Sequence, residues 1–251
     1  KRQRSSMKEL FILGSGVMAR ALAWGLKDNY ALCIVGRSVQ KLNEFQKDGF
    51  QTLLYDEFKA ENKALILAFK PYALDELARK LTGKAKFIIS ILANKDFKDL
   101  QAIKSCNYAL AMPNIAAFHK ASTTPFVCEN AEFKDEIKAI LSTFGKAYEL
   151  ENPAQMSAAM AISGCAPAFL AVVAESIANG GVYGGLKKDL SLKLTQGLFE
   201  SFTALLKHEH PALIKEQVCS PAGVTIKGIK ILEEKAVRGA FFEAINASAK
   251  R

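Results

Sequence analysis

Short apolar runs alternate with helical patterns along the first 150 residues. Five runs read as strands because nearly every position is apolar: 9–13 (ELFIL), 31–35 (ALCIV), 64–69 (ALILAF), 86–91 (KFIISI) and 108–112 (YALAM). The segments between them carry apolar residues at helical spacing: 17–28, 38–48, 72–82 and 95–104. A further helix (133–144) and a closing strand (146–150) follow. Apolar strands joined by helical crossovers predict a mostly parallel sheet with helices on both faces.

The pattern changes after Asn152-Pro153. Long Ala- and Leu-rich helical patterns fill 154–180, 188–208, 221–235 and 237–249, and no further strand is predicted. The fold class is therefore α/β, with a sheet domain over 7–151 and an all-α domain over 152–251.

The first helix of the second domain is apolar nearly all round, which predicts burial on every side and hence an obligate homo-oligomer. Its uncharged run 156–174 is about as long as a membrane span. However, the run is mostly Ala and Ser and contains Gly164 and Pro167, so a subunit contact is expected and a membrane is not.

Composition narrows the class of protein. Five widely spaced cysteines without a CxxC pair indicate a reducing compartment, and we expect a cytoplasmic protein. Three histidines, two of them in HEH at 208–210, give no metal-ligand spacing, so no metal is expected. Lys1, Arg2 and Arg4 supply three of the nine excess positive charges; residues 1–6 precede the first methionine and are typical of a cloning remnant. The other charges are scattered, so no nucleic-acid partner is predicted.

A glycine motif follows the first predicted strand. The pattern GxGxxG/A at a strand-to-helix turn is typical of dinucleotide binding, because glycines permit a tight turn and close approach of a pyrophosphate to a helix N-terminus. The predicted cofactor-binding residues are Gly14, Ser15, Gly16, Val17, Met18 and Ala19. An ordinary strand-to-helix turn is the alternative.

The end of the second strand indicates which dinucleotide binds. NAD-binding domains place an acid about 20 residues after the glycines, to hold the ribose 2′-hydroxyl. Here Gly36, Arg37 and Ser38 stand at that place. A guanidinium and a hydroxyl suit a 2′-phosphate, so we predict NADPH, with NADH weaker. The alternative is that Arg37 is a solvated surface residue.

Two more segments are candidates for ligand contacts. Phe69, Lys70 and Pro71 close the third strand at the edge where doubly wound sheets bind ligands, although Lys70 is also compatible with a surface role. Ser220 is predicted as the N-cap of a later helix and Pro221 as its first residue. The backbone N–H groups that follow are then open to a carboxylate.

Together these residues resemble the pyrroline-5-carboxylate reductase family. The resemblance runs from Met7 and is strongest over 220–245 (SPAGVTIKGIKILEEKAVRGAFFEAI), with FILGSGVMARAL, VGRS, LAFKP, MPN (112–114) and ISGCAPAF in the family's order. It implies a Rossmann domain, a helical domain that dimerises, and reduction of 1-pyrroline-5-carboxylate to proline by hydride transfer from NADPH. The residues implied to bind substrate are Ser220, Ala222, Gly223, Val224 and Thr225, with Thr225 catalytic and Asn114 at the cofactor.

Ile115, Ala116, Cys165 and Phe169 depart from that family's usual residues, which leaves the imine preference open. Two alternatives stay open: a reductase of another cyclic imine carboxylate, and a non-catalytic NADP(H)-binding dimeric sensor. Assembly beyond the dimer is also left open.

Overall fold

The computed structural model describes residues 7–250, which divide into two compact units between Gly164 and Cys165. The first unit contains one eight-stranded sheet in the order β3-β2-β1-β4-β5-β6-β7-β8. Its strands are β1 (Glu9–Leu13), β2 (Ala31–Gly36), β3 (Gln51–Leu54), β4 (Ala64–Leu67), β5 (Phe87–Ser90), β6 (Tyr108–Ala111), β7 (Ser122–Cys128) and β8 (Gly145–Glu149). All neighbouring pairs are parallel except β6 and β7, so the mostly parallel α/β sheet is confirmed.

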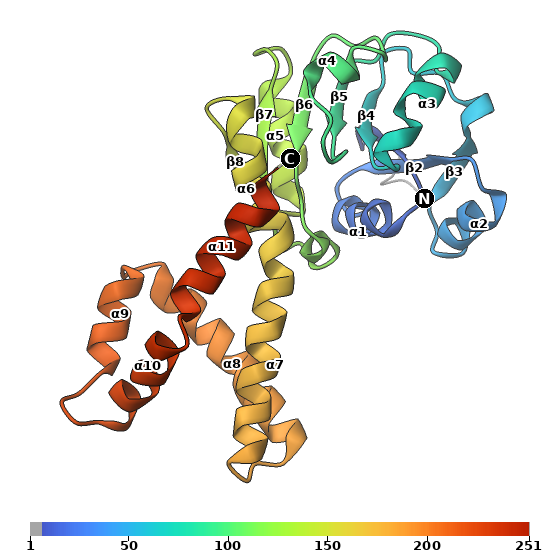
Figure 1. The fold of residues 1–251 in the computed structure, drawn as a ribbon. Coiled ribbons are helices and arrows are strands. Elements are labelled where there is room, and N and C mark those ends of the chain that lie inside the picture. The colour runs from blue at the N-terminus through green and yellow to red at the C-terminus, as the bar shows by residue number, and fades with distance from the viewer. Residues whose placement is uncertain (1–6, 251) are drawn as a thin grey trace. The chain divides into compact units, whose positions relative to one another are not determined.

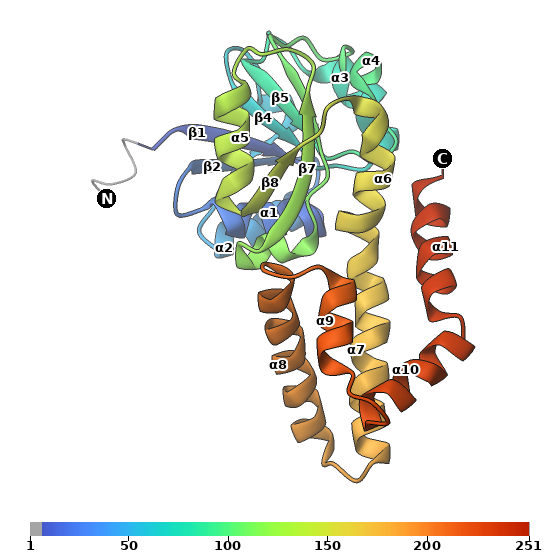
Figure 2. The ribbon, with the colours of Figure 1, turned by 90° about the vertical axis from the view of Figure 1, so that its left-hand side faces the viewer.

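Helices cover both faces of this sheet, as Figures 1 and 2 show. The helices are α1 (Val17–Leu26), α2 (Val39–Lys47), α3 (Leu74–Lys80), α4 (Phe97–Leu100), α5 (Lys134–Thr143) and α6 (Met156–Met160). Alternate strand side chains enter two separate apolar clusters: Ile12 belongs to the one that contains residues of α1, α2 and α5, whereas Leu13 belongs to the one that contains residues of α3 and α4. Burial on both faces explains why these strands are apolar throughout.

The sheet unit differs from the prediction in two strands that were not predicted and in one helix that is shorter than expected. Strand β3 was not predicted because it has only four residues, of which Gln51 is exposed and the other three are half-buried. Strand β7 was not predicted because its first four residues, STTP (122–125), are typical of a turn, although the strand lies between β6 and β8. The helix expected over 95–104 shortens to α4, Phe97–Leu100, capped by the Asp96 side chain accepting from the Asp99 N–H at 3.0 Å.

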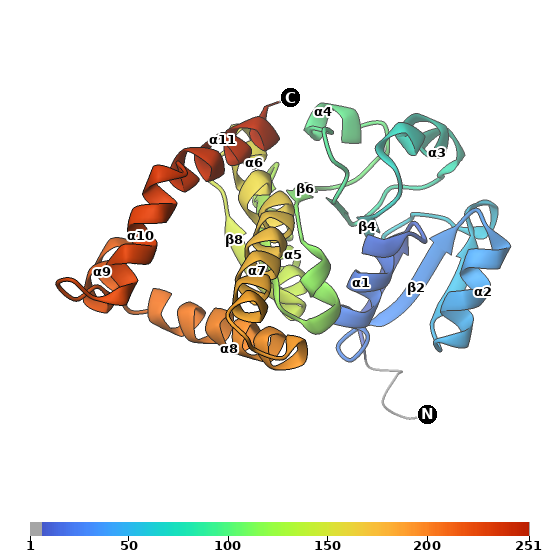
Figure 3. The same ribbon diagram turned by 60° about the horizontal axis from the view of Figure 1, so that its bottom comes forward.

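The second unit is all-helical, as predicted, with α7 (Ala166–Tyr183), α8 (Lys188–Leu206), α9 (Pro211–Val218), α10 (Val224–Glu234) and α11 (Val237–Ala249). Helices α7 and α8, which follow each other along the chain (Figure 3), pack against each other. They approach closely at Gly181, where an added Cβ would lie 2.2 Å from the Ser191 Oγ. That hydroxyl instead donates to the Ala178 carbonyl at 2.7 Å.

The helical segments differ in detail from the expectation. The segment 154–180 is interrupted by a π-helical turn at Ala161–Cys165, two residues before Pro167. Helix α9 was not predicted, and α10 begins at Val224 rather than at 221.

The stretch Pro153–Tyr183 is long and apolar enough to cross a membrane, by length and composition alone. A helix buried by other protein passes the same test. Within this single chain Val172 on α7 is 64% exposed, and Ala178 is the buried residue of that helix, so the expected burial on every side is not achieved by one chain.

Candidate functional site

The carboxyl ends of β1, β2, β4 and β5 surround one cavity of about 530 Å³ in the sheet unit. Parallel strands bring their carboxyl ends to the same edge, which is where ligands of doubly wound sheets bind. The cavity brings together nine of the residues predicted to hold a cofactor: Gly14, Ser15, Gly16, Val17, Met18, Arg37, Phe69, Lys70 and Pro71.

The two motif glycines have different structural roles. Gly14 has a φ of +130°, and a Cβ there would lie 2.3 Å from the Ala68 carbonyl oxygen, so only glycine lets the β1 turn pass the end of β4. Gly16 is the N-cap of α1, and a Cβ there would meet nothing within 4 Å. No side chain caps α1, so its first N–H groups face open space at this edge, as a phosphate site requires.

Ala19, the third position of the motif, does not line the cavity. It is fully buried in the apolar cluster between α1 and the sheet. A small residue here lets the helix approach the strand closely, which is the role that the motif predicts for it.

The segment after β2 contributes a cation to the cavity. Arg37 lines it and is exposed, with Lys41 one turn into α2 beside it. Gly36 and Ser38 are not among the lining residues: Gly36 ends β2, and the Ser38 Oγ accepts from the Lys41 N–H at 3.4 Å as the α2 N-cap. The donor set of guanidinium, ammonium and helix N-terminus fits an anionic dinucleotide.

Sequence reasoning missed several lining residues. Tyr55 follows β3, which was not predicted; burial raises the pKa of its phenol to about 12, against the opposing effect of Arg37, so the hydroxyl is neutral at physiological pH. Ile91, Leu92 and Ala93 follow β5 at the same sheet edge where residues 69–71 follow β4, so the end of a predicted strand is the signal for them. Tyr72 and Glu76 also line the cavity from the segment after β4.

Asn114 is not among the residues that line this cavity, and its side chain is engaged in the protein. Its Oδ1 accepts from the Ala116 N–H at 3.0 Å, and its Nδ2 donates to the Ser163 carbonyl at 3.0 Å. The cofactor contact of Asn114 therefore stays a prediction.

In the helical unit, the segment before α10 differs from the predicted cap. Gly223, not Ser220, is the N-cap, and the Gly223 N–H donates to the Ser220 carbonyl at 3.1 Å in a preceding turn. Ala222 adopts a left-handed φ of +58°, which turns the chain into the helix. Pro221, predicted as the first residue of the helix, therefore lies in the turn before it.

This turn leaves the start of α10 without a side-chain cap. The N–H groups of Val224 and Thr225 lie in the first helical turn and have no intrahelical acceptor. A Cβ on Gly223 would lie 2.3 Å from the Ser220 Oγ, so these residues are closely packed. The five predicted substrate-binding residues form one short segment with open donors and a half-buried Thr225.

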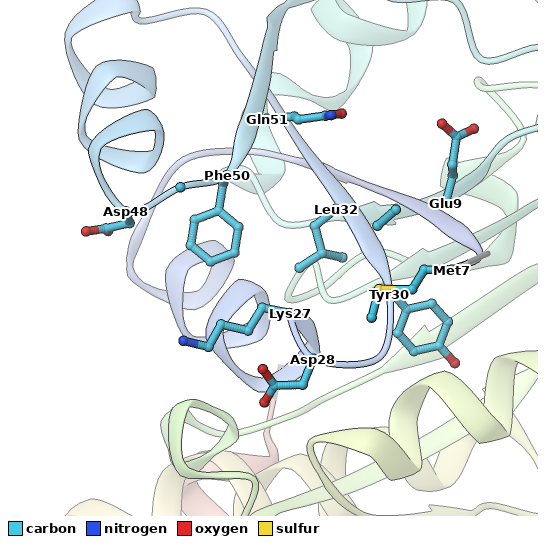
Figure 4. A pocket seen from close by; sticks show the side chains of 11 residues that line it. Met7, Glu9, Lys27, Asp28, Tyr30, Leu32, Asp48, Phe50 and Gln51 are labelled. Atoms are coloured by element: carbon cyan, nitrogen blue, oxygen red, sulfur yellow. The ribbon is translucent and has the colours of Figure 1, made fainter. Parts of the chain in front are cut away.

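A second cavity, of about 540 Å³, lies at the opposite edge of the sheet, at the amino ends of β1, β2 and β3 (Figure 4). Its acids are largely neutralised by neighbours: Asp28 pairs with Lys120 at 2.7 Å, and Asp48 with Arg20. None of the predicted site residues lines it. Among residues 7–250, no group of three or more His, Cys, Asp or Glu is arranged to hold a metal ion.

Comparisons with known proteins agree with this division. The family model described as pyrroline-5-carboxylate reductase dimerisation matches residues 153–251, and the one described as NADP oxidoreductase, coenzyme F420-dependent, matches residues 9–94. The pyrroline-5-carboxylate reductase of Helicobacter pylori is 36% identical, over 98% of this chain and 99% of its own length. That of Synechocystis is 34% identical, over 97% of this chain and 96% of its own.

Solved structures show the same fold. The 1-pyrroline-5-carboxylate reductase of Streptococcus pyogenes matches with a TM-score of 0.87 at 23% identity and 96% coverage of both chains. The pyrroline carboxylate reductase of Plasmodium falciparum, solved with NADP bound, matches with a TM-score of 0.82 at 23% identity, again over 96% of each chain.

Proposed function

Because the chain belongs to the pyrroline-5-carboxylate reductase family, we propose that it reduces 1-pyrroline-5-carboxylate to proline with NADPH. One observation carries the proposal: a dinucleotide cavity and a helix start with open donors occur in one chain that aligns with these reductases over nearly its full length. An oxidoreductase needs both a place for the reductant and a place for the acceptor.

The cavity of the sheet unit supplies the donors for the dinucleotide. The first N–H groups of α1 suit the pyrophosphate, because the N-cap Gly16 has no side chain to bond them and a Cβ there would meet nothing within 4 Å. Arg37 and Ser38 are proposed to hold the 2′-phosphate, with Arg37 providing charge-assisted donors. When bound, NADPH supplies a hydride from its nicotinamide to the C=N carbon.

The segment from Ser220 to Thr225 is proposed to hold the substrate carboxylate, through the Ser220 hydroxyl and the open N–H groups of the first turn of α10. The Thr225 hydroxyl is proposed to donate to the ring nitrogen as its electron pair forms. A protonated imine is already electrophilic, so positioning and one donor suffice. This chemistry needs no His–Asp or cysteine constellation.

We further propose that a second copy of the chain covers the exposed apolar surface of the helical unit. Large apolar side chains are exposed on four of its helices: Val172 (64%), Leu194 (55%), Ile231 (57%) and Phe242 (73%). An isolated soluble protein rarely leaves so many such side chains in water on one small unit. A cytoplasmic homodimer accounts for this surface without lipid or nucleic acid, and sizing by light scattering will show whether dimers assemble further.

The test is NADPH consumption by the purified protein with 1-pyrroline-5-carboxylate and with its six-membered analogue. We expect turnover with the five-membered substrate and a lower kcat/KM for the larger ring. Thr225→Ala is expected to lower kcat by about 10- to 100-fold, the effect of one lost catalytic hydrogen bond. Its NADPH affinity should be unchanged, and Thr225→Ser should retain most turnover.

NADPH binding without turnover of either imine would favour the sensor and would overturn the proposal. A higher kcat/KM for the six-membered ring would assign the protein to another cyclic imine carboxylate.

A further inference from the structure

Besides Lys70, four charged side chains from two segments line the cofactor cavity. Arg37 and Lys41 come from the segment that follows β2, and Glu76 and Lys80 come from α3, which follows β4. Strands β2 and β4 both flank β1, so these two segments border the glycine turn from opposite sides. Glu76 is the acid among the residues lining this cavity.

The Glu76 carboxylate pairs with a lysine of the same helix, α3. The Lys80 Nζ donates to its Oε1 at 3.1 Å, one helical turn along. This hydrogen bond and the Lys80 charge, and more weakly the Arg37 charge, lower the pKa of Glu76 below its ordinary value. Glu76 is therefore ionised at neutral pH, and its charge and that of Arg37 act on each other across the cavity wall.

A guanidinium suits the 2′-phosphorylated ribose of NADPH, whereas a carboxylate suits the free 2′-hydroxyl of NADH. The guanidinium attracts a 2′-phosphate, which a carboxylate repels. A ribose 2′-hydroxyl is a neutral donor and is bound by a carboxylate in NAD-binding domains, where the acid usually comes from the end of the second strand. In this chain that strand ends in Gly36-Arg37, and the acid comes from α3 instead.

We propose that Glu76 sets the balance between the two dinucleotides: its carboxylate limits the preference of this cavity for NADPH and allows NADH to be used. The inference rests on the proposed function only in assigning the cavity to a nicotinamide dinucleotide. Lys80 acts in the opposite sense, because it neutralises Glu76 and adds a cation to the same wall.

The experiment measures the dissociation constants of NADPH and NADH by direct fluorescence titration, without imine, for wild type, Glu76→Gln and Lys80→Gln. We expect Glu76→Gln to raise the ratio of the NADH to the NADPH dissociation constant by about fivefold, the effect of one partly screened unit charge. Lys80→Gln should lower the same ratio. Added salt should reduce both changes, because the interactions are partly exposed.

The matched control is Asp75→Asn, which removes the same charge from the neighbouring exposed position of α3 that does not line the cavity. Its ratio should stay within about twofold of wild type, since solvent screens a charge that faces away from the ligand. An equal effect of Glu76→Gln on both dinucleotides, no effect, or an equal effect of Asp75→Asn would overturn the inference.

The readout separates this inference from the proposed activity. If the wild type binds both dinucleotides and Glu76→Gln shifts the ratio of their dissociation constants, but no imine is reduced, the proposed activity is wrong and the role of Glu76 stands. Reduction of the imine with an unshifted ratio would do the opposite, and a wild-type protein that binds neither dinucleotide would overturn both.

Discussion

The Asn114 Nδ2 donates to the backbone carbonyl of Ser163 at 3.0 Å. Ser163 lies four residues before Pro167, which has no N–H and cannot supply the usual helical donor to that carbonyl. The backbone is π-helical at this point, over Ala161–Cys165. The Ser163 Oγ also donates to the Met112 carbonyl at 3.3 Å, so the segment after β6 is tied to the helix by two hydrogen bonds.

Removing the Asn114 amide should therefore destabilise the sheet unit. In Asn114→Ala the Ser163 carbonyl and the Ala116 N–H lose their side-chain partners, which should cost about 1–3 kcal/mol. For a chain of this length we expect the midpoint of thermal unfolding to fall by about 2–10 °C in calorimetry. Asn43→Ala, at an exposed position of α2, is the control and should change the midpoint little.

The same variant tests the predicted cofactor contact. NADPH titration well below the unfolding temperature should show weaker binding if Asn114 also touches the dinucleotide. Unchanged affinity would leave Asn114 with a structural role alone.

The two motif glycines should respond oppositely to one methyl group. Gly14→Ala should destabilise the fold, because φ is +130° and the new Cβ would lie 2.3 Å from the Ala68 carbonyl oxygen. Gly16→Ala should fold normally, because its Cβ meets nothing within 4 Å. It should nevertheless weaken NADPH binding by about tenfold or more, since the methyl stands where a phosphate would approach the α1 N–H groups.

Calorimetry and NADPH titration on the same samples decide this pair. If Gly16→Ala bound NADPH as wild type does, the pyrophosphate would not lie against this turn.

Arg37→Gln should weaken NADPH more than NADH. Loss of charge-assisted hydrogen bonds to a 2′-phosphate should cost about 1.5–3 kcal/mol, or about 10- to 150-fold in the dissociation constant. NADH has no such group, so its binding should change by less than about threefold. Equal losses for both dinucleotides, measured by the same titration, would contradict the assignment of Arg37.

Buried thiols should make the fold sensitive to alkali. Burial raises the pKa of Cys33 from 9.0 to about 11, and that of Cys128 likewise to about 11. A raised pKa means that the unfolded chain loses the proton first, so stability is fully present below pH 9 and is lost as pH rises toward 11. Each thiol should cost about 1.4 kcal/mol between pH 8 and pH 10.

Urea unfolding with reductant present measures this slope. Cys33→Val should remove about half of the loss attributed to the two thiols, whatever its effect on stability at pH 8. A slope equal to that of wild type would exclude Cys33 as a source.

The sequence predicted those strands and helices whose own residues show the pattern of burial. Apart from Glu9 and Ala31 at the strand starts, the residues of β1, β2, β4, β5 and β6 are buried on both faces, so nearly every position is apolar. The glycine turn and Arg37 were also predicted as cofactor-binding residues, because the first follows a recognisable motif and the second follows the end of a predicted strand. Strands β3 and β7 were not predicted, because pairing with neighbouring strands, and not their own composition, makes them strands.

Only the tertiary structure showed which further side chains share the cavity with the predicted ones. Tyr55, Glu76 and Ile91 are far apart in sequence and carry no motif, yet the parallel register brings the ends of β3, β4 and β5 to one edge. It also moved the cap of α10 from Ser220 to Gly223, because the left-handed Ala222 delays the helix start. Local patterns determine elements and candidate chemistry, whereas the packing of distant strand ends determines which charges act on one another.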